Sequence, residues 1–233
     1  MKTAVIIPAF NEAPSIGGVI QAIPNGLAHR VIVVDNASTD ETPQIARKHG
    51  AEVIDEPQRG YGKACLRGIA AAGDADVLVF LDADFSDDPA VMPRLLEPIE
   101  QGEAEFVVGS RILGDAEPGA LPPHARFGNQ LACFLIRIIY GDRFTDLGPF
   151  RAIRRETLER LQMQDEDYGW TVEMQAKAAR LQIPWREAPV PYRKRIGRSK
   201  ISGTVKGSVL AGIKILWTIA KVSLWRPSLS SNR

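Results

Sequence analysis

Cysteine and histidine are scarce in this chain of 233 residues, which contains two of the first and three of the second. The two cysteines, Cys65 and Cys133, lie in helix-like segments and have no partners at metal-ligand spacing. This scarcity argues against a disulfide scaffold and a zinc site, and it predicts two reduced core thiols in a cytoplasmic protein. No histidine lies near either cysteine in the sequence, so neither has the neighbour that activates a thiol nucleophile.

Long uncharged apolar runs are also missing. The segment Met1–Pro8 has a short apolar run that ends at a proline, with no small-residue cleavage site behind it. It predicts the first strand of a mature protein and not an export signal. Residues 202–225 are apolar, but three lysines divide them into stretches far shorter than the ~20 residues that a membrane-spanning helix needs. We therefore expect no segment that crosses a membrane.

Net charge is nearly absent, yet the two ends of the chain differ strongly. Residues 180–233 hold twelve Lys or Arg and one acid, Glu187, whereas residues 1–179 hold 17 basic and 27 acidic residues. The body thus carries about −10 and the tail +11. Such a tail favours an anionic partner, which can be a nucleic acid, a membrane phospholipid or a phosphorylated substrate.

Short apolar runs alternate with helical patterns through the first half of the chain. This alternation, in a chain that is 45% hydrophobic and 24% charged, predicts one α/β core with a mostly parallel central sheet and helices on both faces. A loop rich in Gly and Pro, 114–123, then favours either a lid or an idle surface loop, before helices near 125–139 and 170–181. The expected strands are 3–7, 31–34, 52–54, 77–81 and 105–109, and the expected helices between them are 13–22, 41–48, 62–72 and 89–101.

The most informative motif is Asp82-Ala83-Asp84, which follows the apolar run 77–81. Buried strands of this kind bind ligands at their carboxyl ends, and alternate residues of an extended segment point the same way. Two carboxylates can then share a cation, or divide between a sugar and a metal. Hard oxygen ligands suit Mg²⁺ or Mn²⁺ bound to a diphosphate. A solvated Asp-rich turn is the alternative.

Other expected strands also end in polar or glycine-containing sequence. Asp35 can accept hydrogen bonds from a nucleobase or ribose, because the residues that follow it can cap the next helix in its place. Gly60, Gly62 and Lys63 open a helix where the backbone can approach a phosphate, although such an entry is often only a turn. Arg111 follows the fifth strand and can reach a sugar or phosphate.

Six motifs, in this order and spacing, resemble those of the family 2 glycosyltransferases. Within that family, the basic segment from Arg195 to Lys200 is similar to that of the polyprenyl-phosphate sugar transferases, which include the dolichyl-phosphate mannose synthases. The resemblance covers roughly residues 3–202. The motifs are Pro8-Ala9-Phe10-Asn11-Glu12, Val34-Asp35-Asn36-Ala37-Ser38-Thr39-Asp40, Gly60-Tyr61-Gly62-Lys63-Ala64, Asp82-Ala83-Asp84, Gly109-Ser110-Arg111 and Asp146-Leu147-Gly148-Pro149-Phe150-Arg151.

The resemblance implies a GT-A type fold and a role for each of these segments. Asp82 and Ala83 would lie beside the sugar donor, and Asp84 would bind Mg²⁺ or Mn²⁺. Two departures affect the expected contacts: Asn36 replaces a second Asp of many relatives, and Ser86 stands where an amide side chain can reach the metal. The implied nucleoside contacts are Pro8, Ala9, Glu12, Asp35 and, near the base or phosphates, Lys63; Arg111, Arg195 and Lys200 would neutralise the donor diphosphate or an acceptor phosphate.

The acceptor decides whether the reaction needs a general base. A hydroxyl needs one, whereas a phosphate monoester, with a second pKa of about 6, is already anionic at neutral pH. Hydroxyl-directed relatives supply the base from a Glu-Asp pair, and this chain has Glu173 with no adjoining Asp. The sequence therefore favours inverting transfer of a hexose from a nucleotide sugar to a polyprenyl phosphate. Glu173 stays a candidate base for the alternative, a soluble transferase that acts on a hydroxyl; a non-catalytic nucleotide-sugar-binding scaffold is the second alternative.

We divide the chain into a nucleotide-sugar-binding half, 1–111, an acceptor-binding half of the same domain, 112–202, and a basic helical tail, 203–233. At helical spacing the tail separates lysines from apolar residues, and Trp217 and Trp225 suit a headgroup boundary. It predicts either peripheral contact with anionic lipid at the inner face of the cell membrane, or a helix docked on the body or on a second subunit. No nucleic-acid-reading motif accompanies the charge, and a homo-oligomer stays open.

Overall fold

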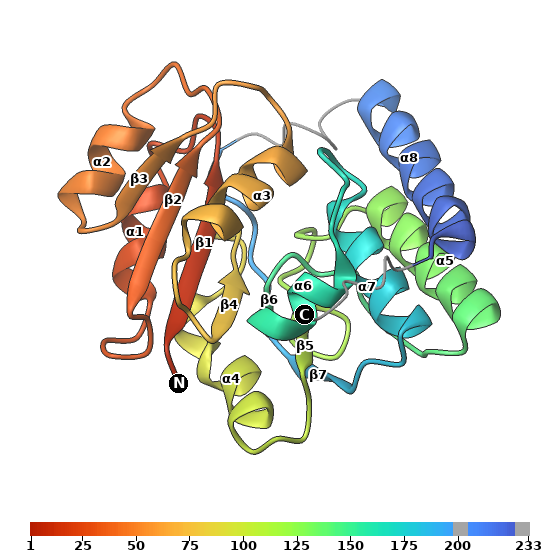
Figure 1. Ribbon diagram of the computed structural model, residues 1–233. Coiled ribbons are helices and arrows are strands. Elements are labelled where there is room, and N and C mark those ends of the chain that lie inside the picture. Colours follow the sequence, from red (N-terminus) through yellow and green to blue (C-terminus); the bar gives the residue numbers. More distant parts are fainter. Residues whose placement is uncertain (198–204, 227–233) are drawn as a thin grey trace.

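The computed structural model describes residues 1–197 and 205–226, and its centre is a seven-stranded sheet (Figure 1). The strand order is β3-β2-β1-β4-β6-β5-β7, and β6 alone runs antiparallel to its neighbours β4 and β5. The predicted α/β fold with a mostly parallel sheet is therefore confirmed. The strands are β1 (Thr3–Ala9), β2 (Arg30–Asp35), β3 (Glu52–Asp55), β4 (Val77–Phe80), β5 (Phe106–Ser110), β6 (Arg151–Arg154) and β7 (Trp185–Pro189).

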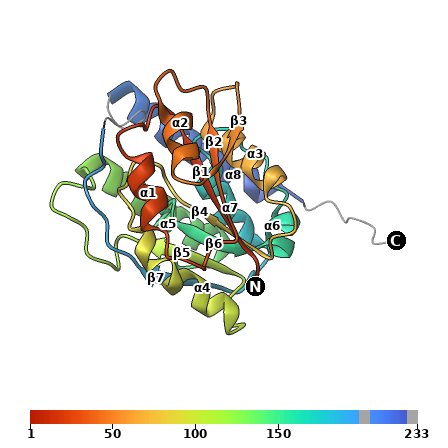
Figure 2. The same ribbon diagram turned by 90° about the vertical axis from the view of Figure 1, so that its left-hand side faces the viewer.

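Helices cover both faces of the sheet, because successive strand residues point to opposite sides. Ile6 of β1 packs into a core with α3, α5, α6 and α7, whereas its neighbour Ile7 packs into a second core with α1, α2 and α4. Both views show these two layers (Figures 1 and 2). The helices are α1 (Ile16–Ala22), α2 (Thr42–Lys48), α3 (Tyr61–Ala71), α4 (Pro93–Glu100), α5 (Pro123–Tyr140), α6 (Arg155–Leu161), α7 (Trp170–Arg180) and α8 (Val205–Leu224), with a 3-10 turn η1 at Pro89–Val91.

Three sequence expectations need correction. The helix expected over 89–101 is split into η1 and α4, since Pro93 occupies the first turn of a new helix. The strand expected over 77–81 ends at Phe80. The second half contains β6, α6 and β7, which the sequence patterns did not predict, because β6 has only four residues and β7 carries Arg186, Glu187 and Pro189 in place of an apolar run.

The tail helix α8 packs on the outside of α5 and α7, at the end of the molecule opposite α2 (Figure 1). Its Ile219 is buried, and the Ile219 carbonyl oxygen accepts a hydrogen bond of 2.7 Å from the Tyr140 hydroxyl of α5. Arg180 of α7 donates to the Ser223 carbonyl oxygen at 2.9 Å. Of the two arrangements expected for the tail, docking on the catalytic body is thus present. Among the helices that the structure describes, none is long and apolar enough to cross a membrane.

Candidate active site

The carboxyl ends of β1, β2 and β4 border a cavity of about 630 Å³. The register brings these ends together, because Ala9 of β1 pairs with Asp35 of β2 and Ile6 pairs with Phe80 of β4. A second cavity of about 580 Å³ lies beside Met1 and contains none of the predicted site residues. The predicted residues that line the first cavity are Pro8, Ala9, Glu12, Asp82, Ala83, Asp84, Arg111 and Arg195.

Asp82 lies directly after β4 and accepts a hydrogen bond of 3.0 Å from the Tyr61 hydroxyl at the start of α3. Burial and, to a smaller extent, the nearby negative charge of Asp84 raise the pKa of the Asp82 carboxyl to about 6, against the lowering effect of Arg195 and Arg111. A carboxylate that burial makes costly to ionise is a favourable place for a cation, which would offset that cost.

Asp84 lies in a turn, not in an extended segment, so the expected strand alternation does not orient the two carboxylates. Its Oδ1 accepts hydrogen bonds from the Ser86 backbone nitrogen at 2.9 Å and from the Ser86 hydroxyl at 2.6 Å. Its Oδ2 forms an ion pair of 3.0 Å with Arg195. Ser86 therefore orients the Asp84 carboxylate. The amide side chain that the family resemblance implies at this position would contact the metal directly instead.

Asp87 lies behind the cavity lining, close enough to Asp82 and Arg111 to interact with their charges, and the sequence interpretation missed it. It is buried beneath the same turn, and neither oxygen of its carboxyl has a hydrogen-bond partner among the residues described. Burial raises its pKa well above the ordinary value, the charge of Asp82 adds to this effect, and Arg111 opposes it. The sequence feature that could have identified Asp87 is the run of four acidic residues within the seven residues 82–88, which is more than a solvated turn requires.

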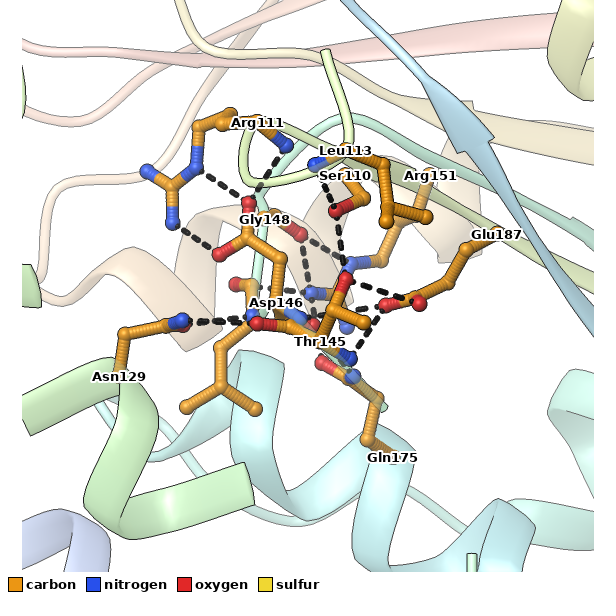
Figure 3. Close-up of polar contacts among 11 residues, drawn as sticks. Ser110, Arg111, Leu113, Asn129, Thr145, Asp146, Gly148, Arg151, Gln175 and Glu187 are labelled. Carbon is orange, nitrogen blue, oxygen red and sulfur yellow. Dashed lines mark hydrogen bonds and ion pairs between the residues drawn. The ribbon is translucent and has the colours of Figure 1, made fainter. Parts of the chain in front are cut away.

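Arg111 is held in place by Asp146, as Figure 3 shows. The buried Asp146 carboxylate accepts from the Arg111 backbone nitrogen at 2.8 Å, from Nε at 2.7 Å and from Nη2 at 2.7 Å. Burial by itself lowers the pKa of the Arg111 guanidinium, but the bidentate pairing with Asp146 outweighs this effect, and the net result is a raised pKa. Arg111 thus presents a fixed positive charge to the cavity.

Further side chains, buried or half-buried, fix the segment that carries Asp146 (Figure 3). Glu187 of β7 accepts from the Thr145 backbone nitrogen at 2.8 Å and hydroxyl at 2.9 Å, and from the Asp146 backbone nitrogen at 3.1 Å. Arg151 is fully buried and donates to the carbonyl oxygens of Gly148 and Thr171. No local pattern in the sequence indicates that Glu187, the single acid of the basic region, supports this turn.

The segment after β7 closes one side of the cavity. Arg195 pairs with Asp84, and Lys194 pairs with Glu117 at 3.4 Å, in the loop that was predicted to be either a lid or an idle loop. Residues 119–122 of that loop line the cavity. The loop is therefore part of the wall of the site.

Asp35 and Asn36 lie at the end of β2, and only Asn36 lines the cavity. Asp35 accepts from the Ser38 backbone nitrogen at 3.3 Å. Asn36 donates to the carbonyl oxygens of Glu56 and Gln58 at 3.1 and 2.7 Å, and accepts from the Gly60 nitrogen at 2.9 Å. Its amide ties two loops together, a function that a second Asp could not perform because it lacks N–H donors.

The glycines at the start of α3 make room for protein backbone. A Cβ atom on Gly62 would collide with the backbone of Asp165 and Glu166, in the loop before α7. Lys63 pairs with Glu166 at 3.3 Å and donates to Gln58 at 2.6 Å, and it does not line the cavity. The sequence interpretation was that these glycines let the backbone approach a phosphate. At Gly62 the structure shows instead that the glycine makes room for the loop before α7.

Glu173 is buried away from the cavity. Its carboxylate accepts from the backbone nitrogens of Gln164 and Asp165, at 3.1 and 2.7 Å, and pairs with Lys177 at 2.7 Å. The carboxylate is thus engaged in holding the loop 162–169 and does not face the cavity. Lys200 lies outside the described residues.

The acidic residues of the site fit a divalent cation. Asp82 and Asp84 line the cavity together with Arg111 and Arg195, and the unpartnered Asp87 lies close enough to Arg111 to interact with its charge. Burial raises the pKa of Asp82 and of Asp87. In the part of the chain that the structure describes, no group of three or more His, Cys, Asp or Glu forms a complete metal site. Mg²⁺ is typically held by one or two carboxylates together with substrate phosphates, and this site can supply that number.

Comparison with known proteins gives one family. The model of the family "Glycosyl transferase family 2" matches residues 4–162. An uncharacterized glycosyltransferase of Mycobacterium tuberculosis is 37% identical over 212 residues, 89% of this chain and 93% of the relative. A dolichyl-phosphate hexose transferase of Haloferax volcanii is 35% identical, over 89% of this chain and 90% of the relative. An undecaprenyl-phosphate mannosyltransferase of Micrococcus luteus is 31% identical, over 91% and 93%.

A solved structure has the same fold. The crystal structure of glucosyl-3-phosphoglycerate synthase from Mycobacterium tuberculosis in complex with Mg²⁺ and UDP matches with a TM-score of 0.78 and 24% identity. The match covers 97% of this chain and 81% of the synthase. At this identity the likeness shows the fold and carries no assignment of substrate.

Proposed function

We propose that this chain, which belongs to glycosyl transferase family 2, moves a hexose from a UDP- or GDP-linked donor to a polyprenyl phosphate, with inversion at the anomeric carbon. The observation that carries the proposal is the single cavity in which Asp82 and Asp84 face Arg111 and Arg195. The relatives named as dolichyl-phosphate hexose transferase and undecaprenyl-phosphate mannosyltransferase support the lipid acceptor.

The side chains of the cavity divide the work of transfer. The acceptor oxygen attacks the anomeric carbon on the face opposite the nucleotide, while the bond to the diphosphate breaks and its electron pair stays on the diphosphate. Arg111, fixed by Asp146, stabilises that developing charge. Arg195 is released from Asp84 to contact the phosphates. Pro8, Ala9, Glu12 and Asn36 contact the nucleoside, with Asp35 behind them.

Asp84, together with Asp82, would hold Mg²⁺ or Mn²⁺. The ion, when bound, supplies positive charge at the leaving diphosphate. A phosphate acceptor is already anionic at neutral pH and needs no base, which agrees with the engagement of Glu173 elsewhere. We place the enzyme in the cytoplasm, at the inner face of the cell membrane, because the acceptor resides in a bilayer.

A second candidate function is transfer to a hydroxyl of a water-soluble acceptor, a reaction in which Glu173 would serve as the base. A binding protein without turnover is the third. The test incubates the purified full chain with radiolabelled UDP-glucose or GDP-mannose, Mg²⁺ or Mn²⁺, and undecaprenyl phosphate in detergent.

Label in the organic phase supports the proposal, whereas label in a new aqueous product, or donor binding without any product, contradicts it. The Asp84→Ala variant should lose transfer and keep its circular dichroism spectrum. The exposed Asp55 at the end of β3 offers the matched control, Asp55→Ala, which should retain activity.

A further inference from the structure

Helix α5 carries two apolar stripes where a surface helix needs one. Its buried side, which includes Ala132, Cys133 and Ile136, packs on the core. The opposite side carries Phe127, Leu131, Phe134 and Ile138, at the i, i+4, i+7 and i+11 spacing of a single helix face. Phe127, Phe134 and Ile138 are 66%, 56% and 65% exposed, so this stripe has no cover in the described protein.

Helix α8 repeats the same arrangement. Its inner side buries Thr218, Ile219 and Val222 against the body. Its outer side carries Ile213, Trp217, Ala220 and Leu224, again at i, i+4, i+7 and i+11. Ile213, Trp217 and Leu224 are 59%, 65% and 84% exposed. Exposed apolar groups of this size and regularity mark an interaction surface.

The two outer stripes belong to neighbouring helices. The hydrogen bond from Tyr140 to the Ile219 carbonyl oxygen joins α5 to α8, and Figure 1 shows both helices at one end of the molecule. We call the outer stripes of α5 and α8 together the apolar face.

The charged residues of α5 and α8 themselves are all basic. The sequences of α5 and α8 contain no Asp or Glu, and the exposed Arg126, Arg137 and Lys221 lie on these helices. We infer that the apolar face docks on an anionic lipid bilayer, with the apolar side chains among the acyl chains and the cations at the headgroups. A two-fold contact between copies would bring equal patches of positive charge together, which disfavours a second copy as the occupant.

Docking is connected to the active site through one ion pair. Lys214 of α8 pairs with Asp165 at 2.9 Å, and the Asp165 carboxylate also accepts from the backbone nitrogens of Asp167 and Gly169. Asp167 and Tyr168 line the cavity. This connection rests on the proposed function. The helix that enters the headgroup layer also positions Asp167 and Tyr168, the part of the cavity wall that a lipid phosphate would contact.

Vesicle sedimentation of the full chain tests the inference without donor or acceptor, so its outcome is independent of transfer. Vesicles of phosphatidylglycerol should bind the protein, and vesicles of phosphatidylcholine should bind it at least tenfold more weakly. The double variant Phe134→Ser/Trp217→Ser changes two exposed side chains, so it should keep its fold and lose at least tenfold in binding. Arg137→Gln/Lys221→Gln should lose about fivefold for each charge removed, and this loss should shrink as salt rises.

The matched control is Arg47→Gln/Lys48→Gln on α2, which lies at the other end of the molecule (Figure 1). It should stay within twofold of the parent. Equal sedimentation of the Phe134→Ser/Trp217→Ser variant and the parent would overturn the inference. A dimer in light scattering that the same double variant abolishes would also overturn it, because the face would then be an interface between copies.

Discussion

Replacement of Asp82 by asparagine is expected to stabilise the ligand-free protein while it abolishes transfer. The pKa of the Asp82 carboxyl is raised from 3.8 to about 6, mainly by burial. Because the raised pKa belongs to the folded state, the ionised carboxylate destabilises the fold at pH values above about 6. That cost is lost as the pH falls through 6 towards 4. Asparagine removes the charge, and its side-chain oxygen can still accept from the Tyr61 hydroxyl.

The magnitude follows from the pKa difference. One pKa unit corresponds to about 1.4 kcal/mol, so the ionised Asp82 costs on the order of 3 kcal/mol at pH 8. At pH 5 the folded carboxyl is mostly protonated, whereas the unfolded one is mostly ionised, and the cost falls to roughly half of that. The free energy of unfolding of Asp82→Asn should therefore exceed that of the parent at both pH values, and the excess should be larger at pH 8.

Urea unfolding at pH 8 and pH 5, without metal or nucleotide, measures this difference. The control Asp55→Asn changes an exposed carboxylate and should stay within about 0.5 kcal/mol of the parent. With saturating Mg²⁺ and UDP the order should reverse, since only the parent keeps both carboxylates. An Asp82→Asn protein that is less stable than the parent at pH 8, or whose gain is the same at both pH values, would refute the reasoning.

Three further substitutions probe the supports of the site. Asp146→Asn removes the charge that orients Arg111 and should lower kcat/KM about 10- to 150-fold, by the worth of a charge-assisted hydrogen bond; unchanged kinetics would contradict this role. Glu173→Gln removes the carboxylate partner of the buried Lys177 ammonium and should cost about 3–5 kcal/mol in urea unfolding, with kcat retained; a lost kcat would make Glu173 a base after all. Gly62→Ala should lower the thermal midpoint through its backbone clash, and an unchanged midpoint would exclude that contact.

Predictability differed between the two halves of the chain. The apolar runs before residue 111 are bounded by turn residues, and each run became a strand within one or two residues of its expected ends. After residue 111 the strands β6 and β7 both carry charged residues, and β7 ends in a proline, so no hydrophobic period reveals them. They are stabilised by pairing with β4 and β5, which are already in place.

In the candidate site, too, some residues can be recognised from the neighbouring sequence, whereas the role of others depends on contacts between distant segments. Asp82, Asp84 and Arg111 were identifiable because each follows an apolar run at a sheet edge. The role of Asp87 was not, because its lack of partners depends on what packs around it. Glu173 matched a catalytic position in the sequence, but its partners Lys177 and the loop 162–169 occupy it.

The sequence by itself determined the α/β order of the fold, the family and the acidic rim of the sheet, because these depend on local period and on residue types at strand ends. Only the tertiary structure decided which side chains meet. Glu187 supports Asp146 across 41 residues, and Lys214 reaches Asp165 from the tail. Segments so distant are brought together by burial of the core, and the same packing leaves the outer stripes of α5 and α8 exposed.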